Sequence, residues 1–193
     1  MKFIEADQLG FDPRPQMGRI FVEGFYHWLK HFCKDKDKLV RAAMHIFKLE
    51  HFVVALDGDK IAAMAACTPG KPPPIRLDKK ILRQTFGFAT GSFAYKMLQK
   101  HLVNHVYPFE LSEGTGSIEF VAAAPEFRRQ GVTYKLLEHV MLTEPYSEYV
   151  LEVADNNTAA IALYEKLGFR EFKRVAGPSN SGIDFVYMRT ERP

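Results

Sequence analysis

Residues 121–133 carry the most informative run of the chain, Val121-Ala122-Ala123-Ala124-Pro125-Glu126-Phe127-Arg128-Arg129-Gln130-Gly131-Val132-Thr133. The run begins as an apolar strand, turns at a proline, and passes through two arginines and a glycine into a helical pattern. Free backbone N–H groups at the start of a helix bind phosphate or pyrophosphate, and a glycine lets the ligand approach the backbone closely. The run equally fits an ordinary strand-to-helix connection with solvated arginines. It is neither a Walker A loop nor a dinucleotide fingerprint, because GxxxxGK and GxGxxG are both absent.

A second informative segment lies downstream. A strand is expected over Tyr149–Ala154, followed by a helix over 157–167 that Gly168 ends. Asn157 stands at the helix start, where its amide can cap the helix or reach a ligand. Tyr164 follows seven residues later and is expected on the same helix face. The two side chains could line a cleft beside the first loop, and Tyr164 equally fits the boundary between core and surface.

The remaining pattern predicts an α/β fold in which a mixed, largely antiparallel sheet is flanked by helices. We expect one domain over 1–193, with a helical insertion at about 69–116 that Gly87 and Gly91 interrupt. The charge run Lys34–Lys38 is expected to be a solvated loop. The expected strands are 1–7, 52–56, 61–67, 117–123, 149–154, 169–175 and 183–189, and the expected helices are 17–32, 39–49, 78–106, 133–142 and 157–167.

Composition excludes several classes of protein. The chain has 193 residues, of which 47% are hydrophobic and 25% charged, as in ordinary globular proteins. A net charge of +3 argues against nucleic acid as the main partner, and no apolar run approaches the ~20 residues of a membrane span. Cys33 and Cys67 have no paired spacing, so neither a disulfide framework nor a zinc ribbon is expected. These features predict a cytoplasmic protein.

Two histidine pairs have the four-residue spacing that lets two side chains share a metal ion, His27 with His31 and His101 with His105. The HExxH pattern is absent and no third ligand is evident. We therefore predict no metal site, and expect these histidines on the surface or on the wall of a cleft.

The two informative segments together resemble the acetyl-CoA-binding core of the GCN5-related N-acetyltransferase (GNAT) family. The family signature is Arg or Gln, two residues, Gly, one residue, then Gly or Ala, and Arg128, Gly131 and Thr133 occupy these places. Thr133 departs from the usual small residue there. The second family segment joins an Asn to a helical Tyr and a Gly-Phe pair, and Asn157, Tyr164 and Gly168-Phe169 match it. The resemblance covers about residues 117–175.

The resemblance implies roles for individual residues. Tyr164 would be the general acid that protonates the departing thiolate, and Asn157 would contact the pantetheine arm or order the cleft. The thioester carbonyl would be held by backbone N–H groups of Val121, Ala122 and Ala123. The pyrophosphate of acetyl-CoA would lie on the loop and helix start formed by Arg128, Arg129, Gln130, Gly131, Val132, Thr133 and Tyr134.

The proton acceptor for the amine is left open. Some family members use a glutamate where this chain has Glu152, and Glu119 on the preceding strand is the other candidate, while water is a third. Strand alternation is expected to put Ser117, Glu119 and Val121 on one face. Either carboxylate equally fits a structural role.

The resemblance implies an enzyme that transfers the acetyl group of acetyl-CoA to a primary amine by direct attack. The acceptor would be a small molecule or a protein N-terminus, and a homodimer is possible. The alternative is a non-catalytic module that binds or senses acyl-CoA on the same fold. The insertion is expected to cover or shape the acceptor site with its aromatic residues Phe86, Phe88, Phe93 and Tyr95.

Overall fold

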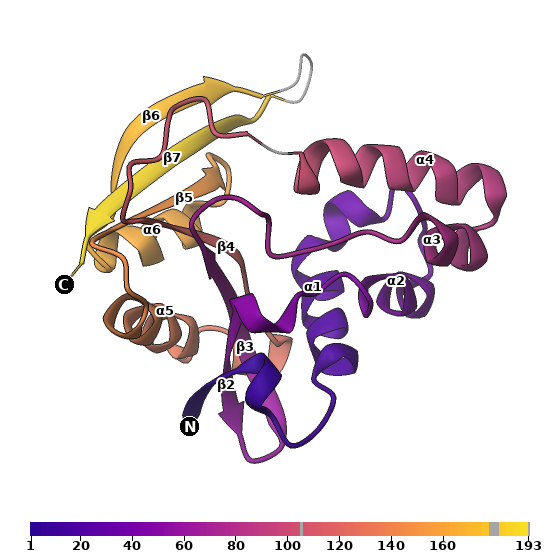
Figure 1. Cartoon of the computed structure of the whole chain (residues 1–193), viewed down its shortest axis with the longest axis horizontal. Coiled ribbons are helices and arrows are strands. Elements are labelled where there is room, and N and C mark those ends of the chain that lie inside the picture. The colour runs from indigo at the N-terminus through magenta and orange to yellow at the C-terminus, as the bar shows by residue number, and fades with distance from the viewer. Residues whose placement is uncertain (105, 178–181, 193) are drawn as a thin grey trace.

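Seven strands form one sheet in the order β1-β2-β3-β4-β5-β7-β6 in the computed structural model, which describes residues 1–104, 106–177 and 182–192 (Figure 1). All neighbouring strands are antiparallel except β4 and β5, so the predicted mixed, largely antiparallel sheet is confirmed. The strands are β1 (Lys2–Glu5), β2 (Phe52–Asp57), β3 (Lys60–Thr68), β4 (Thr115–Ala123), β5 (Glu148–Ala154), β6 (Arg170–Ala176) and β7 (Asp184–Glu191).

Helices cover both faces of the sheet. Helices α5 and α6 lie on one face, and α1 and α2 lie on the other, with α3 and α4 stacked further out (Figure 1). No helix in the described ranges is long and apolar enough to cross a membrane. The helices are α1 (Arg14–Leu29), α2 (Lys36–Ala43), α3 (Lys79–Phe86), α4 (Phe88–Leu98), α5 (Val132–Thr143) and α6 (Thr158–Lys166), and a turn of π-helix over Gln99–Val103 extends α4.

The sheet divides the core into two apolar clusters. One packs α5 and α6 against the sheet around Leu136, Tyr149 and Phe169, and the other packs α1 and α2 around Met17 and Phe47. Strand β3 is buried throughout after its first residue, and its interior is mostly alanine. Small side chains let helices approach a central strand closely from both sides.

The insertion between β3 and β4 is helical, as predicted, but only one of its two glycines breaks it. Gly87 has a φ of +86° and separates α3 from α4. Gly91 lies inside α4, where a Cβ atom would stand 2.4 Å from the carbonyl oxygen of Leu82. The predicted interruption at Gly91 is therefore wrong, because the missing side chain serves close packing of α4 on α3.

The charge run Lys34–Lys38 after α1 is exposed, as predicted, but it is not a loop throughout. Helix α2 begins inside it, because the Asp35 side chain accepts a hydrogen bond from the backbone N–H of Lys38 at 3.1 Å. Lys36 reaches back to Glu23 of α1 at 2.7 Å. An aspartate at the N-cap satisfies one of the free N–H groups of a helix start, so a run of charges can begin a helix.

Candidate active site

Strands β4 and β5 separate at the centre of the sheet. They pair only where Thr115, Gly116 and Ser117 stand opposite Glu148, Tyr149 and Val150. Beyond Ser117, β4 continues along β3 and β5 continues along β7, and no further β4–β5 pairing occurs in the described ranges. We call this region, residues 118–123 of β4 and 151–154 of β5, the β4–β5 divergence.

A bulge in β4 begins just inside the divergence. Phe120 has a φ of +53°, and Phe120 and Val121 together oppose the single residue Ala65 of β3. The Phe120 ring packs beside Phe21, with their centroids 6.1 Å apart. A positive φ is unusual for a bulky residue and is sustained here by surrounding packing.

The bulge changes which side chains share a face of β4. Ser117 and Glu119 are hydrogen-bonded to each other at 3.0 Å. Val121 instead packs in the cluster with Ile118, on the face that α5 and α6 cover. The expectation that Val121 shares a face with Ser117 and Glu119 is therefore wrong, because an extra residue reverses the alternation.

The backbone N–H groups of the three residues predicted to bind the thioester carbonyl do not all point the same way. The N–H of Ala124 donates to Ala62 of β3 at 2.9 Å, and Ala122 stands opposite Met64. Because antiparallel hydrogen bonding alternates, the N–H of Ala122 also points to β3. The N–H of Ala123, between these two, points the other way, toward β5, whereas Val121 lies in the bulge, where the alternation is interrupted.

The start of α5 has the geometry of an anion site. Gly131, with a φ of +74°, is the N-cap and provides no side chain, while Arg129 is also left-handed at +60°. The first intrahelical hydrogen bond runs from the N–H of Lys135 to the carbonyl of Gly131, so the preceding first-turn N–H groups point away from the helix. The N–H groups that begin the helix belong to Val132, Thr133 and Tyr134.

The side chains around this helix start are mostly exposed. Arg128 lies against the end of β4, where its Nε donates to the carbonyl of Ala123 at 3.3 Å. Gln130 donates from Nε2 to the carbonyl of Glu126 at 2.7 Å. Tyr134 is half-buried under the ammonium group of Lys166 of α6, 4.9 Å from its ring centroid. The loop is thus held at both ends while its backbone faces solvent.

Tyr164 is a buried tyrosine on α6. Only 7% of the residue is exposed, and its ring packs 6.0 Å from that of Phe169. Burial alone raises the pKa of the Tyr164 hydroxyl to about 12, so the phenol keeps its proton at neutral pH. Gly168, with a φ of +95°, ends α6 as predicted.

Asn157 precedes the same helix as its N-cap. Its side-chain oxygen accepts a hydrogen bond from the N–H of Ala160 at 3.3 Å. The residue is exposed, whereas Tyr164, seven residues later, is buried. Within the described residues the amide nitrogen of Asn157 has no hydrogen-bond acceptor.

Both candidate carboxylates are half-buried on the other face of the sheet. Glu119 accepts hydrogen bonds through Oε1 from the hydroxyls of Ser117, at 3.0 Å, and Thr68, at 3.4 Å. Glu152 stands opposite Tyr187 of β7. Burial raises the pKa of Tyr187, and the nearby Glu152 carboxylate raises it further. Glu119 and Glu152 flank the β4–β5 divergence from its two strands.

One residue of this polar group was not found by sequence reasoning. Tyr107, which follows the insertion helices, has its hydroxyl 2.7 Å from that of Ser117. It belongs to no motif, and it meets Ser117 only because the chain after α4 folds back over β7. No local pattern signals that contact.

Several histidines and insertion aromatics predicted to line a cleft or the acceptor site are exposed on the surface. His27 and His31 are exposed near the end of α1, and His105 lies outside the described residues. No three His, Cys, Asp or Glu side chains of the described ranges gather in a group that could hold a metal. Phe88 is 73% exposed, and Phe93 is 57% exposed beside Phe32 at the end of α1.

Comparison with known proteins assigns the chain to a family. The model of the acetyltransferase (GNAT) family matches residues 22–169. An N-alpha-acetyltransferase of Saccharolobus solfataricus is 39% identical over 77 residues, 38% of this chain and 46% of that protein. A [ribosomal protein bS18]-alanine N-acetyltransferase of Salmonella typhimurium is 46% identical over 54 residues, 26% of this chain and 36% of that protein. The chain thus spans half or less of these curated relatives.

A solved structure matches the whole fold. The crystal structure of an N-acetyltransferase from Staphylococcus aureus Mu50 superposes with a TM-score of 0.65 at 17% identity, covering 98% of this chain and 100% of that one. At this identity the likeness concerns the fold alone.

Proposed function

Because the chain belongs to the acetyltransferase (GNAT) family, we propose that it transfers an acetyl group from acetyl-CoA to a primary amine by direct attack. One observation carries the proposal. The proton donor Tyr164 packs on the face of the sheet with α5 and α6, whereas Glu119 and Glu152 lie on the face with α1. The β4–β5 divergence lies between them, so amine and thioester can meet there with an acid on one side and a base on the other.

The donor is proposed to bind along the start of α5 and the free edge of β4. Acetyl-CoA supplies the acetyl thioester. The first-turn N–H groups of α5, with Arg128 and Arg129, bind its pyrophosphate. A Cβ built on Gly131 would meet no atom within 4 Å, so the backbone there is open to a ligand. Thr133 replaces a usual Gly or Ala, and its hydroxyl can donate to the same phosphates.

Acetyl transfer requires the protein to stabilise the carbonyl oxygen, to accept a proton from the amine and to protonate the leaving thiolate. The N–H of Ala123 stabilises the negative charge on the carbonyl oxygen as the amine nitrogen bonds to the carbonyl carbon. Glu119 or Glu152 accepts the proton that the amine loses, directly or through water. When the carbon–sulfur bond breaks, Tyr164 gives its proton to the leaving thiolate.

The acceptor is proposed to be a protein N-terminus, with a small-molecule amine as the other possibility. The two relatives described above are named for acetylation of alpha-amino groups or of an alanine, which supports this choice.

The compartment and the assembly are also proposals. Cys33 and Cys67 are free thiols, which supports a reducing compartment such as the cytoplasm. A homodimer is a further expectation, which sedimentation of the purified chain would test.

Substitution of Tyr164 by Phe separates catalysis from binding. Tyr164→Phe keeps the ring in the core and is expected to lower kcat by about 100-fold, since it removes a general acid, while the Kd for acetyl-CoA stays unchanged. The rate of thiol release measures kcat, and titration calorimetry measures the Kd for acetyl-CoA.

The matched control is Tyr149→Phe. Tyr149 is a buried tyrosine whose hydroxyl donates to the carbonyl of Met141 at 2.9 Å, and its loss is expected to leave kcat unchanged. An unchanged kcat in Tyr164→Phe would remove Tyr164 from its role. Binding of acetyl-CoA by the wild type with no turnover would favour the non-catalytic alternative.

A further inference from the structure

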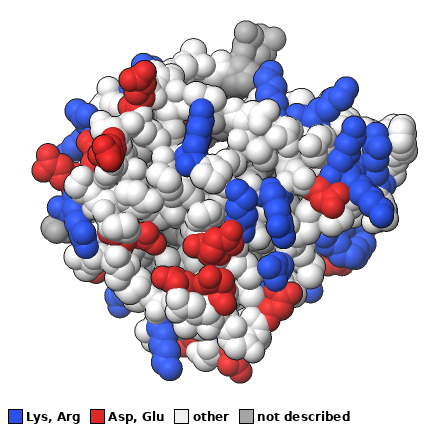
Figure 2. Space-filling model, in the orientation of Figure 1, with Lys and Arg blue, Asp and Glu red and all other residues white. Residues whose placement is uncertain are grey.

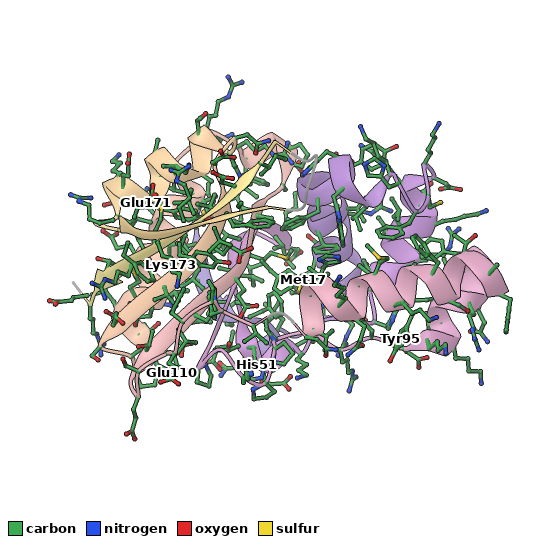
Figure 3. All side chains as sticks on the ribbon, turned by 90° about the horizontal axis from the view of Figure 1, so that it is seen from above. Met17, His51, Tyr95, Glu110, Glu171 and Lys173 are labelled. Carbon is green, nitrogen blue, oxygen red and sulfur yellow. The ribbon has the colours of Figure 1, made fainter. Side chains whose placement is uncertain are left out.

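The segment Val106–Ser112, which we call the strap, is the part of the insertion that lies between its helices and β4. Figure 1 shows it running from the end of α4 over β7 and β6 before it enters β4. Lys173 of β6 donates from Nζ to the carbonyl of Pro108 at 2.7 Å. The Phe109 ring packs against Phe172 and Tyr187, at centroid distances of 4.9 and 5.4 Å. In Figure 3, Glu110 of the strap and Lys173 lie in the same half of the molecule, far from Tyr95 of α4.

These anchors bring the strap to the place where β4 and β5 separate. Ser117 is the last residue of β4 that pairs with β5, and the Tyr107 hydroxyl lies 2.7 Å from its Oγ. The Tyr107 ring also stands 5.9 Å from that of Tyr187. The strap therefore contacts Ser117, which donates to Glu119, and Tyr187, which stands opposite Glu152.

The direction of the hydrogen bonds follows from counting protons. Ser117 has one hydroxyl proton, and it donates to Glu119 Oε1 at 3.0 Å, because a carboxylate only accepts. Tyr107 must then be the donor to Ser117. Burial raises the pKa of Tyr107, so this donor keeps its proton at neutral pH. The result is a chain of donors from Tyr107 through Ser117 to Glu119.

We infer that Tyr107 is a positioning residue for acetyl transfer, which orients Ser117 so that Ser117 and Thr68 hold the Glu119 carboxylate as the proton acceptor for the amine. The inference rests on the proposed function and selects Glu119 over Glu152. Its physical basis is the polarisation of one hydrogen bond by the next. A carboxylate that accepts hydrogen bonds from two hydroxyl groups keeps one orientation.

The charged and titratable groups around Glu119 come from several elements. Tyr107 of the strap lies on the same face of the sheet as Glu119, whereas Cys67 of β3 packs on the opposite face, where burial raises the pKa of its thiol and keeps it protonated. Glu152 of β5 and Tyr187 of β7 lie across the divergence. A charged Glu152 would disfavour a second charge on Glu119, whereas hydroxyl donors favour it. When all variants are assayed with the same amine, the effect of the nearby charge stays constant, so any difference in pH profile comes from the hydroxyl donors.

The test is the acidic limb of the kcat profile in Tyr107→Phe, Ser117→Ala and the double variant. Loss of a donor raises the pKa of the base, so the limb moves to higher pH. We expect a shift of about one pH unit in Ser117→Ala, which loses a charge-assisted hydrogen bond, and about half that in Tyr107→Phe. Tyr107→Phe should add nothing in the Ser117→Ala background, because it acts through Ser117.

The control variant is Tyr149→Phe, which loses a buried hydroxyl elsewhere and should leave the limb in place. Additive effects in the double variant, or an unshifted limb in Tyr107→Phe, would overturn the inference. So would full activity of Glu119→Gln alongside an inactive Glu152→Gln. If Tyr107→Phe does not fold, the shift in Ser117→Ala decides. Absence of wild-type turnover would instead reject the proposed function.

Discussion

The bulge at Phe120 determines, residue by residue, what the candidate site contains. It leaves Ser117 and Glu119 on the face of α1 and turns Val121 to the opposite face. It also lies where β4 leaves β5, so that the backbone N–H of Ala123 faces an open edge rather than a partner strand. A single extra residue thus supplies both the distribution of side chains and the free donor.

Gly131 offers a direct residue-scale test of donor binding. Gly131→Ala is expected to destabilise the fold by about 1 kcal/mol, because its φ of +74° suits an alanine poorly. It is also expected to weaken acetyl-CoA binding about tenfold, because the new methyl group occupies space beside the helix start. Thermal unfolding and calorimetric binding measure the two effects.

The control for this change is Gly58→Ala in the β2–β3 turn. Gly58 has a φ of +60° and nothing within 4 Å of a built Cβ, so it carries the same backbone strain. It should lose similar stability and keep the wild-type Kd. Equal affinities in the two variants would argue against a phosphate site at Gly131.

At the residue scale, the sequence predicts what a local motif encodes. The glycine at the start of α5, the cap at Asn157 and the helix end at Gly168 follow from backbone rules that act within a few positions. Tyr107 could not be found in this way, because its partner Ser117 is brought to it by the folding of the strap. The face of Val121 was missed because nothing in an apolar strand marks where a bulge falls.

Helix packing in the insertion is decided at the scale of elements. Gly91 of α4 lies against the middle of α3, with room for no side chain. Gly91→Ala is expected to lower the free energy of unfolding by about 2 kcal/mol, because a Cβ 2.4 Å from the backbone oxygen of Leu82 forces the helices apart. Denaturant unfolding measures the change.

The control for Gly91 is Gly10→Ala. Gly10 has no atom within 4 Å of a built Cβ and no positive φ, so its stability should stay within about 0.5 kcal/mol of wild type. A Gly91→Ala variant as stable as Gly10→Ala would contradict the packing of α4 on α3.

Most elements could be predicted from hydrophobic periodicity, whereas their boundaries could not. The start of α2 depends on the cap at Asp35, which lies within a charge run that looks like a loop. The continuity of α4 through Gly91 depends on contact with another helix. Tertiary contacts of this kind override local propensity, so they become visible only in the folded chain.

The whole molecule carries its charge unevenly. Figure 2 shows Lys and Arg side chains gathered over the end of the molecule that holds α3 and α4. Residues 69–104 contain a single acidic residue, Asp78. The basic residues of the same segment are Lys71, Arg76, Lys79, Lys80, Arg83, Lys96 and Lys100. The net charge of +3 is the sum of this basic segment and a more acidic remainder, so the composition of the whole chain does not reveal the basic segment.

Both layers of helices contribute to one candidate reaction centre. The layer of α5 and α6 brings the anion site and Tyr164, and the opposite side brings Glu119, Glu152 and the strap. The central claim is that these parts together acetylate an amine. That claim concerns the whole chain and is best tested on it without substitutions.

The most direct test incubates the wild-type chain with acetyl-CoA and each member of a panel of amines. The panel contains peptides with free N-termini, the same peptides with blocked N-termini, and small primary amines. Thiol release and the mass of each acceptor are measured together. The proposed function predicts one thiol released for each acetyl group gained by a free amine, and none with a blocked peptide. Binding of acetyl-CoA without thiol release for any amine would contradict it.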